Sequence, residues 1–243
     1  MREVREMRAL ILAAGRGERM RPLTDDIPKP LLKAGGRRLI EWQIEGLARA
    51  GVREMVVNVA HLADAFERAL GHGEDLGVTL AYSREGDRAE AALETLGGIV
   101  RALPLLGTDP FVVVSGDIVT DFDYSTLAAA AARLAAGETD AHLVLVDNPA
   151  FHALGDMGLV DGRIAPDAGE RFTYANVGVF APRLFAGLAP VRARLFPWLY
   201  AAARSGRVTG EHYAGRWFNV GTPAELARLD AELGYSAGDG ADS

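Results

Sequence analysis

Cysteine is absent from this 243-residue chain, which excludes a disulfide framework and any metal site built on thiolates. Long hydrophobic runs are absent as well. The apolar stretch near the N-terminus runs into a glycine-containing loop and is too short to span a bilayer, so a β-strand is a better interpretation than a signal peptide. No internal repeat is found. We therefore expect a cytoplasmic protein without a membrane-associated part.

Positive charge is also in short supply. The chain has 26 Lys and Arg against 33 Asp and Glu, which gives a formal net charge of −7. A general nucleic-acid binder needs a basic face, so nucleic acid is not expected as a partner. A small anionic ligand is compatible with this balance, because a local cationic loop can outweigh a diffuse negative field. The composition leaves open whether the protein is a monomer or a small homo-oligomer.

Short apolar segments alternate with amphipathic helical patterns through the first two-thirds of the chain. This rhythm is typical of βαβ units and predicts an α/β fold with three αβα layers, Rossmann-like, around a mainly parallel sheet. Ligands of such sheets bind at the carboxyl ends of the strands. The predicted strands are Ala9–Ala13, Glu54–Val59, Val78–Tyr82, Phe111–Val114 and His142–Val146, and the predicted helices are Leu39–Ala50, Leu62–Leu70, Gly98–Leu103 and Tyr124–Ala136.

The pattern changes after Asn148. Residues 160–163 (VDGR) predict a tight hairpin turn, and Phe172–Phe180 predicts a strand. Two helical stretches and a short extended segment follow. A last helix is predicted from Pro223 to about Leu233, because proline is favourable in the first turn. We expect residues 235–243, which are small and polar, to form a disordered tail.

The string LAAGRGERMRPLTDDIPKPL, residues 12–31, combines features that rarely occur together. Its glycines let the backbone approach a ligand closely, its prolines hold a loop in one shape, and its arginines and Lys29 suggest an anionic ligand. A dinucleotide-binding fingerprint is a poor match, since its third glycine is missing and Asn58, instead of an acidic residue, stands at the end of the next strand. No Walker A motif is present. A solvated arginine turn is the alternative interpretation.

As a whole, this string closely resembles the signature of the sugar-1-phosphate nucleotidyltransferases. Within that family, the chain is most similar to the N-acetylmuramate α-1-phosphate uridylyltransferases of peptidoglycan recycling. The resemblance covers residues 8–234 and implies one nucleotidyltransferase domain, with a nucleotide-binding part at about 8–147 and a small inserted sugar-binding lobe at about 148–222. The matching stretches are LAAG-x-G-x-RM-x-PLT and PKPL in the loop, LET-x-GGI at 93–99, V-x-GD at 114–117, LVDNP at 145–149, GEHY at 210–213 and VGT at 220–222.

The resemblance implies transfer of UMP from UTP to a sugar-1-phosphate, with these two small molecules as partners. In this reaction a phosphate oxygen attacks the α-phosphorus and pyrophosphate leaves, so catalysis depends on positioning and charge neutralisation. Arg19 offers a guanidinium fork to the β- and γ-phosphates. Lys29 offers a point charge to the α-phosphate or to the incoming sugar phosphate. We therefore predict Arg19, Lys29 and Asp117 as the catalytic residues.

Asp117 follows an apolar run, FVVVSG, and would bring a carboxylate close to the triphosphate. A Mg²⁺ ion between the carboxylate and the triphosphate would remove their repulsion, and the resemblance implies that this aspartate is a metal ligand. The alternative role for Asp117 is to cap a helix or a turn. The family usually has a second aspartate before Val-Gly-Thr, but here Asn219 occupies that position. An amide oxygen binds Mg²⁺ without adding negative charge. We predict Mg²⁺ as cofactor and Asp117 and Asn219 as its ligands, with a plain turn residue as the alternative for Asn219.

The other site residues are assigned by resemblance. The LET-x-GGI stretch matches the segment that contacts the pyrimidine, although a helix N-terminus explains it equally well. Each sugar-binding residue could equally be a hydrogen-bonding loop residue. The predicted nucleotide-binding residues are Leu12, Ala13, Ala14, Gly15, Arg16, Gly17, Lys29, Glu94, Gly97, Gly98, Ser115 and Gly116. The predicted sugar-binding residues are Asp147, Asn148, Gly155, Glu170 and Asn176.

Two alternatives to this function remain at the level of sequence. One is a nucleotidyltransferase that uses a hexose or heptose phosphate and another nucleotide. The other is a catalytically silent nucleotide-sugar sensor on the same fold. The presence of Arg19, Lys29 and Asp117 argues against the sensor, and Asn219 is the one feature that favours it.

Overall fold

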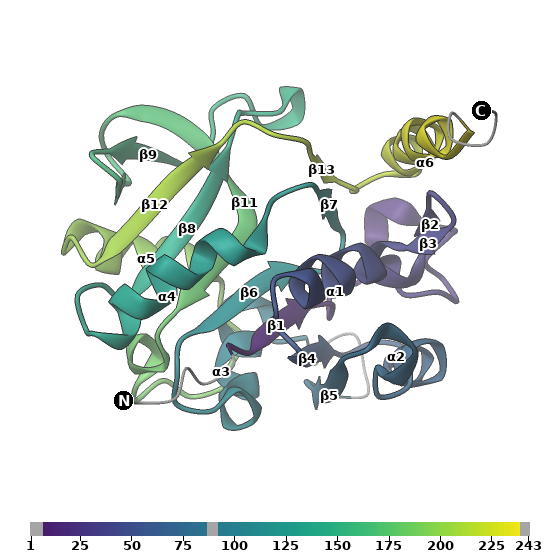
Figure 1. Ribbon diagram of the computed structural model, residues 1–243, viewed down its shortest axis with the longest axis horizontal. Coiled ribbons are helices and arrows are strands. Elements are labelled where there is room, and N and C mark those ends of the chain that lie inside the picture. Colours follow the sequence, from purple (N-terminus) through teal and green to yellow (C-terminus); the bar gives the residue numbers. More distant parts are fainter. Residues whose placement is uncertain (1–6, 87–91, 239–243) are drawn as a thin grey trace.

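The computed structural model describes residues 7–86 and 92–238 (Figure 1). Its main sheet has the strand order β5-β4-β1-β6-β11-β8-β12-β10-β9. The strands of this sheet are β1 (Ala9–Leu12), β4 (Glu54–Val59), β5 (Thr79–Arg84), β6 (Phe111–Ser115), β8 (Ala141–Val146), β9 (Met157–Val160), β10 (Arg163–Ala165), β11 (Glu170–Phe180) and β12 (Val208–Tyr213). Two small antiparallel pairs join β2 (Lys33–Ala34) to β3 (Arg37–Arg38) and β7 (Ile118–Thr120) to β13 (Trp217–Asn219).

Helices cover both faces of the sheet, as Figure 1 shows. Consecutive strand residues point to opposite faces: Ile11 packs in a core with α1, α2 and α4, and Leu10 packs in a second core with α3 and α5. This arrangement confirms the predicted three αβα layers. The helices are α1 (Leu39–Arg49), α2 (Ala63–Leu70), α3 (Glu94–Leu106), α4 (Leu127–Ala135), α5 (Leu195–Arg204) and α6 (Pro223–Gly238).

Strands β5, β4, β1 and β6 are parallel, and β11 pairs with β6 in the antiparallel sense. The part of the chain after β8 therefore continues the same sheet. The predicted hairpin is confirmed between β9 and β10, where both central turn residues, Asp161 and Gly162, have positive φ. Strand β12, parallel to β8, was not predicted from sequence.

Most predicted boundaries lie within a few residues of those in the structure, and the largest differences are at the start of α3 and the end of α6. Helix α3 begins at Glu94 and not at Gly98, because backbone and side-chain groups from distant segments satisfy the amides of its first turn. Helix α6 continues to Gly238 and so includes the start of the predicted disordered tail. Adding a residue to an existing helix is favourable, and neither proline nor a β-branched residue interrupts residues 234–238. Residues 239–243 lie outside the described part.

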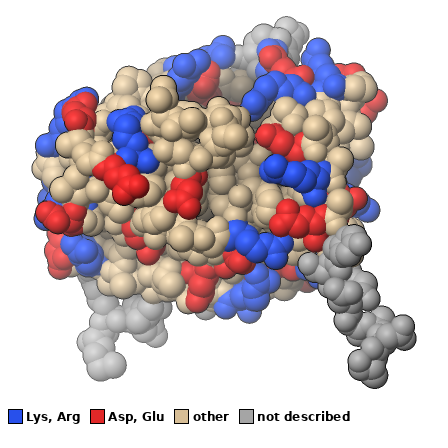
Figure 2. All heavy atoms as spheres, turned by 90° about the horizontal axis from the view of Figure 1, so that it is seen from above, with Lys and Arg blue, Asp and Glu red and all other residues tan. Residues whose placement is uncertain are grey.

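Acidic and basic side chains are interspersed on the face of the molecule in Figure 2, which has no continuous basic surface. Across residues 7–86 and 92–238, no helix combines the length and apolar character needed to cross a membrane.

Candidate active site

The carboxyl ends of three parallel strands meet at one edge of the sheet. Leu12 at the end of β1 pairs in register with Asn58 on β4 and with Ser115 on β6. A cleft of about 840 Å³ opens at this edge, large enough for a nucleotide-sized ligand. The loop after β1, the start of α3 and the residues after β6 line it, which is where the sequence predicted the ligand site.

The glycine-rich loop turns back on itself. Gly17 has a φ of 62°, and its carbonyl accepts a hydrogen bond of 2.8 Å from the Thr24 hydroxyl. A Cβ atom at position 17 would lie 3.0 Å from Thr24 Cγ2 and 3.1 Å from Lys29 Cβ, so a side chain would be both strained and crowded. A Cβ atom at Gly15, in contrast, would meet nothing within 4 Å. The loop thus brings Lys29 close to Gly17, near the start of the loop, and leaves the backbone of Gly15 open to the cleft.

Lys29 and Asp117 form an ion pair inside the cleft. The Lys29 Nζ lies 2.6 Å from Asp117 Oδ2, and the two side chains are 11% and 27% exposed. The turn at Gly116 joins the loop to the end of β1. A Cβ atom on Gly116 would lie 3.3 Å from Pro30 Cβ, and the Gly116 amide donates a hydrogen bond of 2.9 Å to the Leu12 carbonyl. The structure therefore brings the cationic loop and the acidic residue after β6 together in one cleft.

The segment 219–221 runs beside this ion pair. Asn219 pairs with Ile118 across β13 and β7, and the Val220 amide donates to the Asp117 carbonyl at 3.1 Å. Gly221 lies next to Arg19, since a Cβ atom there would be 3.1 Å from Arg19 Nη2. The β7–β13 pair thus places Asn219 opposite Ile118, the residue after Asp117, although Asn219 itself does not line the cleft.

These residues fit a divalent metal that relies on its substrate for ligands. Within residues 7–86 and 92–238, no group of three or more His, Asp or Glu could hold a metal alone. Mg²⁺ commonly binds through one or two protein oxygens plus substrate phosphates. Asp117 lines the cleft and Asn219 does not, and the metal-binding role of this pair stays a prediction. The charged residues of the wall balance one another, so a triphosphate would need an added cation. They are Arg16, Arg19, Lys29 and Arg192 against Glu18, Glu85, Glu94 and Asp117.

Sequence reasoning missed several residues of the wall, among them Asn58, Glu85 and Arg192. Asn58 and Glu85 are buried and hydrogen-bonded to each other, and Arg192 reaches the cleft from the loop before α5. Burial raises the pKa of the Glu85 carboxyl, while hydrogen bonds from the Leu93 amide and Asn58 act in the opposite direction. A polar residue at the end of a buried strand was the available signal for Asn58. No sequence signal pointed to Glu85 or Arg192.

Gly97 and Gly98 lie buried in α3 and do not line the cleft. A Cβ atom on Gly97 would be 2.2 Å from the Val191 carbonyl oxygen, and one on Gly98 would be 2.4 Å from Glu85 Oε1. Protein atoms therefore occupy the space where a close approach of the base was expected. Glu94, the first residue of α3, does line the cleft, and its carboxylate lies 3.3 Å from Arg192. Its role in base binding stays a prediction.

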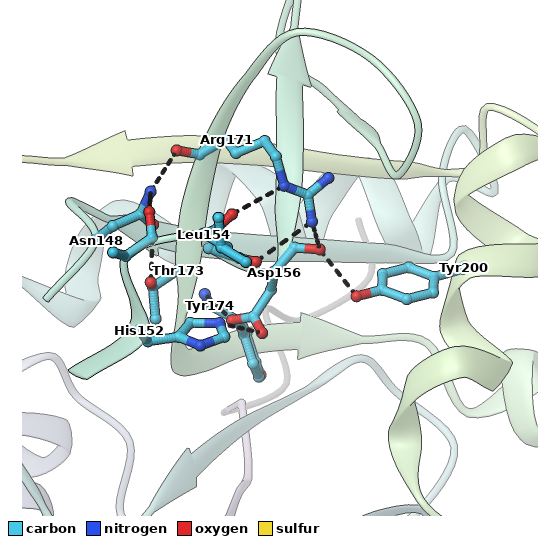
Figure 3. A network of polar contacts seen from close by, with 10 residues as sticks. Asn148, His152, Leu154, Asp156, Arg171, Thr173, Tyr174 and Tyr200 are labelled. Atoms are coloured by element: carbon cyan, nitrogen blue, oxygen red, sulfur yellow. Dashed lines mark hydrogen bonds and ion pairs between the residues drawn. The ribbon is translucent and has the colours of Figure 1, made fainter. Parts of the chain in front are cut away.

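The predicted sugar-binding residues lie after β8, outside the wall of the cleft. Asn148 is engaged in its own loop (Figure 3): its Nδ2 donates to the Arg171 carbonyl and its Oδ1 accepts from the Thr173 hydroxyl, both at 2.9 Å. Gly155 is required there, because a Cβ atom would be 2.5 Å from Asn148 Oδ1. The exposed Asp147 accepts a hydrogen bond of 2.8 Å from His212 on β12.

Asn176 and Glu170 lie at very different distances from the cleft. Asn176 has a φ of 57° at a β-bulge in β11, beside Val177, which pairs with Val114 on β6. Strained bulges of this kind often adjoin functional sites. Glu170 lies six residues earlier on β11, about 20 Å along the strand, and pairs with β9. The structure does not bring Glu170 to the strand ends that form the cleft.

The chain matches known proteins in sequence and in fold. A family model described as nucleotidyl transferase matches residues 8–160. The chain is 45% identical to an N-acetylmuramate alpha-1-phosphate uridylyltransferase of Neisseria meningitidis over 94% of its own length and 99% of that protein's. It is 37% identical to the Caulobacter vibrioides protein of the same name over 93% of this chain and 96% of that protein.

The fold matches a solved structure of more distant sequence. The inositol-1-phosphate CTP transferase of T. maritima superposes with a TM-score of 0.74 at 21% identity, covering 98% of both chains. At this identity the match shows the fold only.

Proposed function

The chain belongs to the nucleotidyl transferase family, and we propose that it transfers UMP from UTP to N-acetylmuramate α-1-phosphate, forming UDP-N-acetylmuramate and pyrophosphate. The observation that carries this proposal is the meeting of the cationic loop and Asp117 in one cleft at the carboxyl ends of β1 and β6. Similarity to two uridylyltransferases over nearly the whole chain favours this pair of substrates over a hexose or heptose phosphate. The reaction would serve peptidoglycan recycling in the cytoplasm, where UTP is available.

We assign separate tasks to the residues of the cleft. An oxygen of the sugar phosphate forms a bond to the α-phosphorus, the bond from that phosphorus to the bridging oxygen breaks, and its electron pair leaves with pyrophosphate. Lys29, held near the loop backbone, neutralises charge at the α-phosphate, and Arg19 neutralises the leaving pyrophosphate. The open backbone at Gly15 offers amides to the phosphates.

A divalent metal, which we propose to be Mg²⁺, completes the charge balance. Asp117 through Oδ1 and Asn219 through its amide oxygen would hold it, and when bound it supplies the positive charge that the balanced wall lacks. A silent sensor is not favoured, because Arg19, Lys29 and Asp117 all line the cleft.

Substrate preference tests the proposed reaction directly. We expect UTP with N-acetylmuramate α-1-phosphate to give the highest kcat/KM in a matrix of nucleoside triphosphates against sugar-1-phosphates, measured by pyrophosphate release. A clear preference for glucose-1-phosphate or for GTP would overturn this substrate assignment while leaving the reaction class intact.

The role of Asn219 is tested by Asn219→Asp. Two unit charges about 4 Å apart interact by about 4 kcal/mol at an effective dielectric near 20. Desolvation of the new carboxylate and its repulsion from Asp117 and the phosphates offset much of this energy. We expect a net gain of about 1 kcal/mol, or several-fold tighter Mg²⁺ binding, in a magnesium titration of pyrophosphate release at saturating UTP.

Asn219→Ala should shift the same titration in the opposite direction, because it removes the oxygen altogether. Coinciding curves for the wild type and both variants would place Asn219 outside the metal shell. A higher Mg²⁺ requirement in Asn219→Asp would show that the field at this position is already too negative for a second carboxylate.

A further inference from the structure

A series of buried hydrogen bonds runs along the wall of the cleft, which Ala13, Asn58 and Glu85 help to form. The Ala13 amide donates to Asn58 Oδ1 at 2.6 Å, Asn58 Nδ2 donates to Glu85 Oε1 at 2.6 Å, and the Leu93 amide donates to Glu85 Oε2 at 2.7 Å. Both residues are buried: Asn58 is 3% exposed and Glu85 is 8% exposed. The series thus joins the start of the glycine-rich loop to the residue that precedes α3.

The hydrogen bonds in this series have a fixed direction. Both oxygens of Glu85 accept from donors that cannot reverse their role, namely an amide NH₂ group and a backbone N–H. Asn58 must present its oxygen to Ala13, so its nitrogen faces Glu85. An ionised carboxylate at position 85 and an amide at position 58 therefore satisfy every group, and either residue changed alone leaves a mismatch.

Helix α3 is shaped around this pair. A Cβ atom on Gly98 would lie 2.4 Å from Glu85 Oε1 and 2.7 Å from Asn58 Nδ2. The glycine allows the pair to press against the helix, which carries Glu94 and Thr95 into the wall of the cleft. The position of the start of α3 relative to Ala13 is consequently set by two side chains that lie between them.

We propose that Asn58 and Glu85 are positioning residues that set the distance between the glycine-rich loop and the start of α3, so that the phosphates and the base of one nucleotide are bound together. This inference rests on the proposed uridylyltransferase function, because it assigns the triphosphate to the loop and the base to the start of α3. The pair acts through the backbone at Ala13 and Leu93 and not through the sugar phosphate, so its effect falls on UTP.

Exchange of the two side-chain types tests the proposal. Glu85→Gln leaves one oxygen to face two donors, and Asn58→Asp sets two carboxylates against each other. The double variant Asn58→Asp/Glu85→Gln restores a partner for every donor, since the new carboxylate accepts from Ala13 and from the new amide, whose oxygen accepts from Leu93. Each single variant should raise the KM for UTP about tenfold with little change in the KM for the sugar phosphate. The double variant should return to within about threefold of wild type.

Asp140→Asn provides a control for general destabilisation. Asp140 precedes β8 at the end of the sheet away from the cleft, where it pairs with Arg183 and Arg207. This variant should lower the melting temperature and leave the KM for UTP unchanged. Single variants with a wild-type KM for UTP, or a double variant as impaired as the worse single one, would overturn the proposal.

Calorimetric titration with UTP separates this inference from the proposed function. A wild type that binds UTP but does not turn over N-acetylmuramate α-1-phosphate would contradict the function, and the same affinity pattern across the variants would still support the positioning role. If a single variant does not fold, the double variant decides: UTP affinity within threefold of wild type supports the proposal, and loss of affinity contradicts it.

Discussion

Lys29→Ala is expected to lower turnover roughly 10²-fold or more, the cost of losing one electrostatic contact that strengthens in the transition state. Lys29 is well enclosed within the cleft: its Nζ is 2.6 Å from Asp117, and its side chain is 11% exposed. Low exposure strengthens its interaction with a phosphate, because nearby water screens the charge less. Steady-state pyrophosphate release at saturating substrates measures the effect.

The same substitution should leave the fold intact. Asp117 loses its partner, but its side chain is partly exposed and can be hydrated, so we expect a melting temperature close to that of wild type. Lys33→Ala is a matched control, because Lys33 is an exposed residue of β2 and does not line the cleft. Normal turnover in a folded Lys29→Ala protein would refute the role assigned to Lys29.

Gly97→Ala is expected to destabilise the protein by about 2 to 3 kcal/mol, the range of an overpacked core. In most helices this change stabilises by about 1 kcal/mol, because alanine is the better helix former. Here the new Cβ would lie 2.2 Å from the Val191 carbonyl oxygen and 2.8 Å from Leu93 Cβ. The loop that supplies Val191 also accepts hydrogen bonds from the Leu96 and Gly97 amides through Ala193, so it cannot withdraw without loss.

Gly234→Ala is the matched control within α6. Gly234 is exposed, and a Cβ atom there meets nothing within 4 Å, so this variant should gain up to about 1 kcal/mol. Urea unfolding midpoints compare the two variants with wild type. Equal gains at both positions would show that the loop at Val191 moves away from α3 at little cost.

Local pattern was sufficient to predict most of the sheet. Strands such as β4 and β6 are runs of buried β-branched and apolar residues, and this composition by itself favours a central strand. Strand β12 was missed because VTGEHY has a glycine and three polar residues and forms by pairing with β8 and β10, which are distant in sequence. The start of α3 was misplaced for a related reason, since Glu94 has a φ of 60° that only tertiary contacts maintain.

The candidate site divides in the same way. Arg19, Lys29 and Asp117 were predicted because each stands in a short segment whose residue types indicate phosphate or metal binding. The structure brings all three into one cleft. The Asn148 side chain forms hydrogen bonds with Arg171 and Thr173, which is the behaviour of a hydrogen-bonding loop residue, the alternative considered for each predicted sugar-binding residue. Glu85 was missed because its role depends on Asn58 and Leu93, which different segments supply.

The sequence by itself determined most of the strand pattern and the residue types that can meet a phosphate, because these depend on neighbours within a few positions. Only the tertiary structure decided which side chains meet across segments: Lys29 with Asp117, Asn58 with Glu85, and the Val191 carbonyl against Gly97. Such contacts depend on how separate elements pack, and close packing in a folded interior leaves each pair a single arrangement that no local pattern encodes.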